Sequence, residues 1–272
     1  MGYLARKAST QRSQAYWRHS VLKSEDATGS FEYRPFVIGS PTTHLAETWL
    51  ISLLTRQREF TPNTAVYSYL WPRYTRASHI FAPYIHGYRR REHDVTEAMG
   101  GDPDLVAVVL DLKQYYPSIN KDRVEERFVR HVLKTDLTKE EKNAAGVFVA
   151  QLLHSTGVSG VPIGPPLSHI LGNLALENVD FQMSQVFPGR YFRYVDDVVI
   201  VVPRTEEESA MSRFRTLVGA EGLNLNETKT DRVSASIWKE RISQRKNGFI
   251  AGWVRKSSTS PPNLSSPVSL PV

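Results

Sequence analysis

The stretch YFRYVDDVVIVVP, Tyr191 to Pro203, places two adjacent aspartates among residues that favour strands. The run VVIVV follows Asp197 without a break, which is typical of a strand buried on both faces. We interpret the stretch as two strands joined at Asp196 and Asp197. Aspartate is a favoured turn residue, so a plain hairpin turn explains the pair as well as a functional role does.

Two neighbouring carboxylates at the edge of a buried sheet repel, and each raises the pKa of the other unless a cation joins them. A third carboxylate, Asp111, ends the apolar run LVAVVLD. If the two strands lie side by side, Asp111 comes close to Asp196 and Asp197, and carboxylate oxygens are ligands that Mg²⁺ prefers. The sequence has no cysteine and no histidine cluster that would favour a softer metal.

Length and composition indicate a globular protein. The chain has 272 residues, of which 40% are hydrophobic, enough to bury the core of one large or two smaller domains. Its net charge of +6 suits an anionic partner but is not specific. Because cysteine, a signal peptide and an apolar run of membrane-spanning length are all absent from the sequence, we expect a cytoplasmic protein with no membrane contact.

Apolar periodicity and turn residues divide the chain into segments. The polar segment 1–30 is expected to be a loosely packed arm, and 257–272, which has no charge and no helical pattern, is expected to be disordered. The predicted helices lie at about 121–134, 137–154, 167–186 and 205–220. The helix at 137–154 opens on a capping box, Thr138 to Glu141.

Four motifs follow one another in the order and spacing of the palm domain of reverse transcriptases. They are DLKQYY from Asp111, GVPIGPPLSHILGN from Gly160, YVDD from Tyr194 and GLNLNETKT from Gly222. The chain resembles this family over about 105–230, and HGYRRR extends a weaker match to the preceding segment. Ile163 stands where most members have Gln, and the resulting PIGP resembles the abortive-infection and defence-associated branch or the group II intron-like branch of bacterial enzymes.

The resemblance implies an α+β fold with the fingers and palm of a right-hand polymerase and an antiparallel palm sheet. The expected parts are fingers at 31–104, a palm at 105–235 with a fingers-type helical insertion at about 121–157, and a short primer-grip-like strand pair at 236–256 with Trp238, Phe249 and Trp253 on its apolar side. Only about forty residues follow Lys229. We therefore expect the thumb to be absent or vestigial, so that the chain binds duplex weakly unless a second protein chain, an oligomer or a structured RNA supplies the thumb. The alternative is a truncated or frame-shifted copy of a longer enzyme.

The implied reaction is addition of deoxynucleotides to a primer 3′-OH, with an RNA template and a DNA primer or product as partners. Asp111, Asp196 and Asp197 would hold two Mg²⁺ ions, for which Mn²⁺ can substitute. Tyr116, five residues after Asp111, would lie beneath the sugar and leave no room for a 2′-OH, or is merely a core aromatic. Lys229 would protonate the leaving pyrophosphate, or is an ordinary exposed lysine.

The remaining expected contacts concern the nucleotide. Pro162 and Gly164 would form a loop against nucleotide and template, because glycine lets a backbone approach closely. Ser168 would contact the nucleotide or serve as a helix N-cap. Arg89 is expected to grip the triphosphate, with Arg90 and Arg91 as alternates, because its planar fork matches phosphate oxygens.

Two other functions remain open from the sequence. One is template-independent or protein-primed DNA synthesis in bacterial antiphage defence. The other is a catalytically inactive palm that binds nucleic acid as a scaffold. The three intact aspartates argue against the scaffold, which would not require them.

Overall fold

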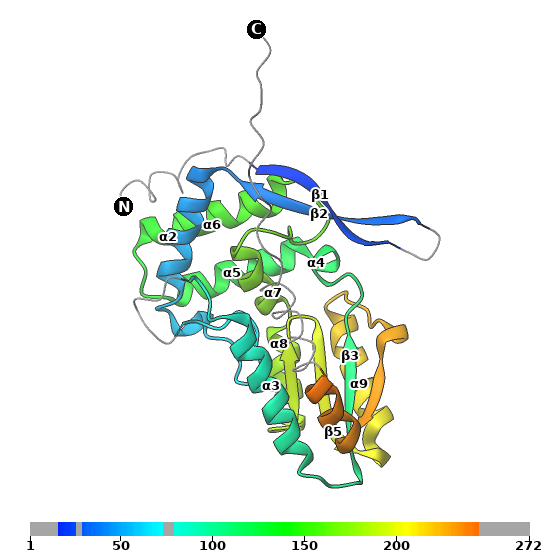
Figure 1. Cartoon of the computed structure of the whole chain (residues 1–272). Helices are drawn as coiled ribbons and strands as arrows, with labels where there is room; N and C mark the ends of the chain where they lie inside the picture. The colour runs from blue at the N-terminus through cyan, green and yellow to red at the C-terminus, as the bar shows by residue number, and fades with distance from the viewer. Residues whose placement is uncertain (1–15, 26–28, 73–78, 245–272) are drawn as a thin grey trace, which may run out of the picture.

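A four-stranded antiparallel sheet forms the lower half of the molecule in Figure 1. The computed structural model describes residues 16–25, 29–72 and 79–244. The sheet has the order β4-β5-β3-β6, and its strands are β3 (Leu105–Asp111), β4 (Tyr191–Tyr194), β5 (Asp197–Pro203) and β6 (Asp231–Ser234). β3 and β5, the two apolar runs of the sequence, lie at its centre, where both faces are covered.

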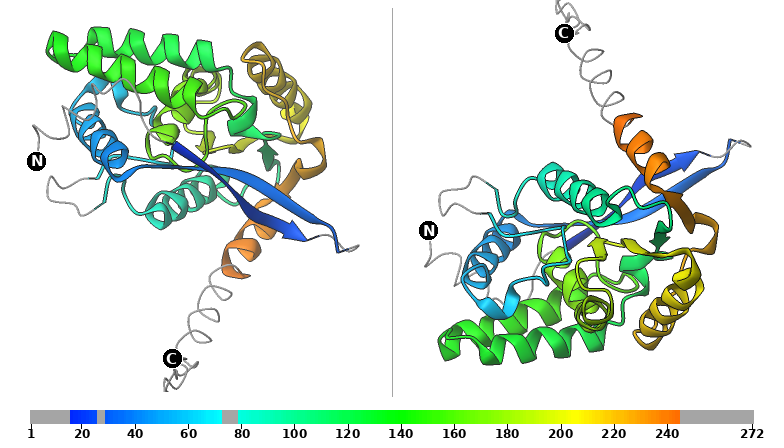
Figure 2. Two further views of the ribbon diagram at one scale, coloured as in Figure 1. Left: turned by 90° about the horizontal axis from the view of Figure 1, so that it is seen from above. Right: turned by 90° about the horizontal axis from the view of Figure 1, so that it is seen from below.

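Helices cover both faces of this sheet, and Figure 2 shows α3 and α9 on opposite sides of it. The helices of this half are α3 (Tyr84–Met99), α8 (Glu177–Val186) and α9 (Glu207–Ala220). Because side chains alternate along a strand, Val108 of β3 packs in the same core as Phe214 of α9, and the neighbouring Ala107 packs in a second core with Val95 of α3. Alternate side chains of the strands therefore pack against the helices on the two faces of the sheet.

A helical layer forms the upper half of the molecule (Figure 1). Its elements are α2 (Pro41–Leu54), α4 (Tyr115–Ser118), α5 (Lys121–Lys134), α6 (Lys139–Ser155) and α7 (Leu167–Ala175). Short 3₁₀ turns lie at η1 (Arg58–Phe60), η2 (Arg204–Glu206) and η3 (Glu227–Lys229). The predicted capping box is confirmed, since Thr138 and Glu141 bond reciprocally at the start of α6.

The N-terminal part differs from the expected polar arm over 1–30. Strand β1 (Tyr16–Glu25) pairs with β2 (Phe31–Gly39) in an antiparallel hairpin. Side chains such as Trp17 and Val21 are half exposed, so the hairpin carries little of the apolar periodicity that reveals a buried element. Its base joins the rest of the fold where the Val37 amide donates to the Ile163 carbonyl at 2.7 Å.

Two other predictions are wrong in detail. The helix expected over 167–186 is broken at Leu176, whose backbone leaves the helical region between α7 and α8. Residues 235–244 are helical, whereas a strand pair was expected at 236–256. Trp238 of this segment packs against the α3 side of the sheet. Phe249, Trp253 and the tail 257–272 lie outside the described residues.

No helix within the described ranges is long and apolar enough to cross a membrane.

Candidate active site

The three aspartates of the sequence motifs meet at one end of the sheet. β3 and β5 pair so that Asp111 lies directly opposite Asp197, and Asp196 precedes β5 in the turn from β4. The Leu112 amide donates to the Asp196 carbonyl at 3.3 Å, which extends the pairing past the strand end. The prediction that the two apolar strands lie side by side is confirmed.

Negative charge is concentrated at this end of the sheet. Burial raises the pKa of Asp196 to about 6, and the charges of Asp197 and Asp111 add to the effect. The Lys229 ammonium, 3.3 Å from the Asp111 carboxylate, opposes this rise in the pKa. The carboxylates of Asp197 and Asp111 therefore make ionisation of Asp196 more costly, which is the condition that a bound cation relieves.

The donor set fits a hard divalent cation, although no group of three or more His, Cys, Asp or Glu side chains in the described part of the chain is already arranged to hold a metal ion. Carboxylate oxygens on neighbouring strands are the ligands that Mg²⁺ takes together with water and phosphate. The Asp111 carboxylate instead faces Lys229 and the side-chain amide of Asn226.

Asn226 is a site residue that the sequence analysis did not single out. Its Nδ2 donates to Oδ2 of Asp111 at 3.0 Å, and its backbone amide donates to the Asp111 carbonyl at 2.8 Å. It lies within the GLNLNETKT motif, three residues before Lys229, so the motif was the one available signal. Asn226 fixes the orientation of the first aspartate.

The Tyr116 ring is held from several sides. Its hydroxyl lies 2.9 Å from Nδ1 of His169, and it also bonds the hydroxyl of Tyr69. The His169 imidazole stacks on the Tyr69 ring with centroids 3.7 Å apart. A Cβ at Gly172 would lie 3.3 Å from the Tyr116 ring, so only glycine gives the ring this space without a shift. His169 lies within the GVPIGPPLSHILGN motif but was not singled out, and Tyr69 lies in none of the motifs.

The loop before α7 is packed against the β1–β2 hairpin. Pro162 is buried, and Gly164 has a φ of +126°. A Cβ at Gly164 would lie 2.2 Å from the Val37 carbonyl, so the close approach that glycine permits is to β2. Ser168 is fully buried and is not an N-cap, because that position belongs to Pro166.

The three arginines of α3 have different surroundings. Arg89 is exposed, and Arg90 lies 3.6 Å from the Asp94 carboxylate. Arg91 is buried, with its guanidinium over the ring of Tyr194 and a weak bond from Nη1 to the Asp197 carbonyl at 3.4 Å. Arg91 therefore supports the aspartate turn, and Arg89 remains the arginine open to a phosphate.

The comparisons with known proteins agree with this fold. A family model described as "Reverse transcriptase (RNA-dependent DNA polymerase)" matches residues 63–255, more than half of the chain. The chain belongs to the reverse transcriptase family.

One curated relative is the Retron Mx162 reverse transcriptase of Myxococcus xanthus, 25% identical over an alignment of 180 residues that covers 58% of this chain and 37% of the relative. One solved structure of similar fold is telomerase from Candida albicans, with a TM-score of 0.51 and 12% identity over 84% of this chain and 43% of that one. The chain spans less than half the length of either.

Proposed function

We propose that this chain is an RNA-directed DNA polymerase that adds deoxynucleotides to the 3′-OH of a primer. The observation that carries the proposal is the pairing of Asp111 with Asp197 across β3 and β5, with Asp196 in the adjoining turn. This arrangement occurs in a chain of the reverse transcriptase family, which supports a working site over the inactive scaffold.

Asp111, Asp196 and Asp197 are proposed to hold two Mg²⁺ ions, with Mn²⁺ as a substitute. The support is the raised pKa of Asp196 and the carboxylate donor set. When bound, Mg²⁺ supplies positive charge that lowers the pKa of the attacking hydroxyl and offsets the charge of the triphosphate. Asn226 would keep the Asp111 carboxylate oriented during this chemistry.

The residues of the chain account for the bond changes as follows. The primer 3′-OH gives up its proton to solvent water as its oxygen attacks the α-phosphorus, and the bond from that phosphorus to pyrophosphate breaks. Lys229, 63% exposed beside Asp111, is proposed to give a proton to the leaving pyrophosphate. Arg89, exposed on α3, is proposed to bind the triphosphate, with Pro162 and Gly164 shaping the loop nearby and Ser168 supporting that loop from within.

Tyr116 is proposed to exclude ribonucleotides. Its ring is partly exposed, and the bond to His169 fixes its orientation. A rigid aromatic ring at the sugar leaves no room for a 2′-OH.

The proposed partners are an RNA template, a DNA primer or product, and deoxynucleoside triphosphates. The Candida albicans telomerase was solved with a fragment of telomeric RNA, which supports an RNA partner by analogy. The test is primer extension on an RNA of defined sequence with Mg²⁺, followed by sequencing of the product. We expect DNA complementary to the template, and no product from Asp196→Ala. Products made without a template would contradict the proposal.

A further inference from the structure

The residue between the tyrosine and the aspartates of the turn has an unusual backbone. Val195 has a φ of +58°, in the left-handed region. A β-branched residue rarely adopts this conformation, because its side chain meets its own backbone, and it persists only where the surroundings impose it. The contacts that impose this conformation on Val195 also fix the position of the backbone where Asp196 begins.

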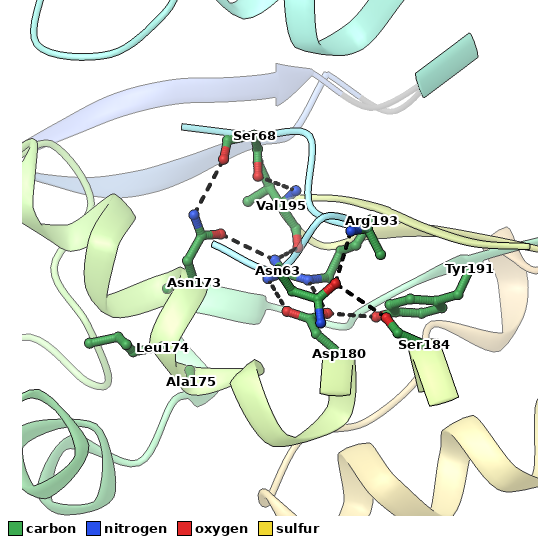
Figure 3. Close-up of polar contacts among 12 residues, drawn as sticks. Asn63, Ser68, Asn173, Leu174, Ala175, Asp180, Ser184, Tyr191, Arg193 and Val195 are labelled. Carbon is green, nitrogen blue, oxygen red and sulfur yellow. Dashed lines mark hydrogen bonds and ion pairs between the residues drawn. The ribbon is translucent and has the colours of Figure 1, made fainter. Parts of the chain in front are cut away.

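Both backbone polar groups of Val195 are bonded to side chains, as Figure 3 shows. The Val195 amide donates to Oγ of Ser68 at 2.9 Å. The Val195 carbonyl accepts from Nη1 of Arg193, also at 2.9 Å. Rotation of either peptide group would break one of these bonds, so the turn is held from both sides. We call the side chains that hold it, together with their supports, the Val195 clamp: Ser68, Asn173, Asp180 and Arg193.

The Arg193 half of the Val195 clamp is rigid. The Arg193 side chain is completely buried, and its Nε and Nη2 bond the two carboxylate oxygens of Asp180 at 2.7 and 2.6 Å. Asp180 also accepts from the hydroxyl of Tyr191 at 2.8 Å. A bidentate guanidinium pair of this kind has one geometry, so Nη1 can only point toward the turn.

The Ser68 half is anchored to β4 through the backbone of the preceding residues Ala65 and Tyr67. The Arg193 amide donates to the Ala65 carbonyl at 2.8 Å, and the Tyr67 amide donates to the Arg193 carbonyl at 2.9 Å. Asn173 joins the halves, because its Nδ2 donates to the Ser68 carbonyl and its Oδ1 accepts from Arg193, each at 3.3 Å. Ser68 is 1% exposed, so water does not compete for its hydroxyl.

We propose that Ser68 and Arg193 are positioning residues that set the place of the Asp196 carboxylate by holding Val195 in its left-handed conformation. The inference rests on the proposed function, in which Asp196 binds a divalent cation. Ser68 is 127 residues from Val195 in sequence, so a segment that precedes α3 directly controls a turn of the palm. A shift of Ala65–Ser68 relative to β4 would change the affinity of the site for its cation.

The test uses Ser68→Ala in the full chain. Arg193→Ala is unsuitable, because it would leave Asp180 buried without its partner and threaten folding. Ser184→Ala is a matched control, since it also removes one hydroxyl from this part of the structure. The Ser184 hydroxyl bonds Oδ1 of Asn63 at 3.3 Å, away from the turn backbone (Figure 3). Thermal melts establish that both variants are folded.

Two measurements distinguish a failure of the inference about the Val195 clamp from a failure of the proposed function. Hydrogen exchange at the Val195 amide, which needs no metal and no activity, is expected to be roughly tenfold faster in Ser68→Ala and unchanged in Ser184→Ala. Mn²⁺ binding followed by electron paramagnetic resonance is expected to weaken by about tenfold in Ser68→Ala, as when other supports of metal ligands are removed. Asp196→Ala serves as the reference for loss of the site.

Val195→Gly supplies a rescue, because glycine adopts a positive φ without steric cost. In that background, Ser68→Ala is expected to have a smaller effect on Mn²⁺ affinity than in the parent chain. Unchanged exchange at Val195, unchanged Mn²⁺ affinity, or an undiminished effect in the Val195→Gly background would each overturn the inference. Equal Mn²⁺ affinity of the parent chain and Asp196→Ala would instead refute the proposed cation site, and the inference would fall with it.

Discussion

The hydroxyl of Tyr116 lies 2.9 Å from Nδ1 of His169, and the imidazole of His169 lies flat on the ring of Tyr69. Burial lowers the pKa of His169 to about 4, so this imidazole is neutral at neutral pH. Burial also keeps the Tyr116 hydroxyl protonated by raising its pKa. The contact is therefore a hydrogen bond between neutral groups that fixes a ring without adding charge beside the aspartates.

Tyr116→Val is expected to admit ribonucleotides, because it removes the ring that would meet a 2′-OH. The ratio of kcat/KM for a ribonucleotide to that for its deoxy form should rise by at least about tenfold, the scale of a lost steric contact in a pocket. Tyr116→Phe is the control, since it keeps the ring and loses only the bonds of the hydroxyl, including the one to His169. An unchanged ratio in Tyr116→Val would leave the ring a structural role alone.

Lys229→Ala is expected to lower kcat by roughly 10²-fold with little change in KM for the nucleotide, because a general acid acts in the transition state. Single-turnover rates across pH should lose their basic limb. Lys229→Arg retains the charge near Asp111 but is a poor proton donor, so it should resemble the alanine variant. A fall confined to nucleotide affinity would make Lys229 a binding residue.

Asn226→Asp is expected to destabilise the metal-free protein, because it puts a fourth negative charge against Asp111, where an amide now donates at 3.0 Å. Asn226→Ala removes the bond without adding charge and should cost about 1 kcal/mol. Denaturant unfolding with and without Mg²⁺ measures both. If the two variants were equally stable without metal, the proposed crowding of negative charge would be wrong.

Glu47→Gln is expected to change how stability depends on pH. Burial raises the pKa of Glu47 from 4.5 to about 7, although its carboxylate accepts the Leu167 amide at 2.7 Å. Between these two values the folded state binds more protons than the unfolded state, so the parent chain loses stability as pH rises through this range. The glutamine variant stays neutral, so its free energy of unfolding should exceed that of the parent chain by on the order of 3 kcal/mol above pH 7. This difference should vanish below pH 4.5.

Denaturant unfolding of the parent and the Glu47→Gln variant at several pH values measures this gain. The imidazole of His44 lies 3.6 Å from the Glu47 carboxylate, and His44→Gln, which removes this ring, is the control. If the free energies of unfolding of the parent and of Glu47→Gln changed with pH in parallel, ionisation of Glu47 would not destabilise the folded state.

Local patterns in the sequence predicted the centre of the fold. The apolar runs that became β3 and β5 and the capping box of α6 are short-range features, and Asp111, Asp196 and Asp197 follow directly from where the strands end. These elements could be predicted because neighbouring residues suffice to define them.

The parts that could not be predicted depend on contacts distant in sequence. Ser68 meets Val195 across 127 positions, and His169 meets Tyr116 across 53. Ser68 lies in none of the four motifs, and His169 lies in one of them, but the residues beside it do not identify Tyr116 as its partner. The β1–β2 hairpin was missed for a different reason, since its exposed side chains give no periodic apolar signal.

The pairing between β3 and β5 has one register, which depends on the length of both strands. Residues from Leu105 to Asp111 pair in unbroken succession with those from Pro203 to Asp197. Because side chains alternate between faces, deleting one residue inside β3 would turn the residues beyond it to the opposite core and slide Asp111 away from Asp197. The two strands can therefore vary in sequence but hardly in length, whereas loops that join the helices of the upper half are free of this constraint.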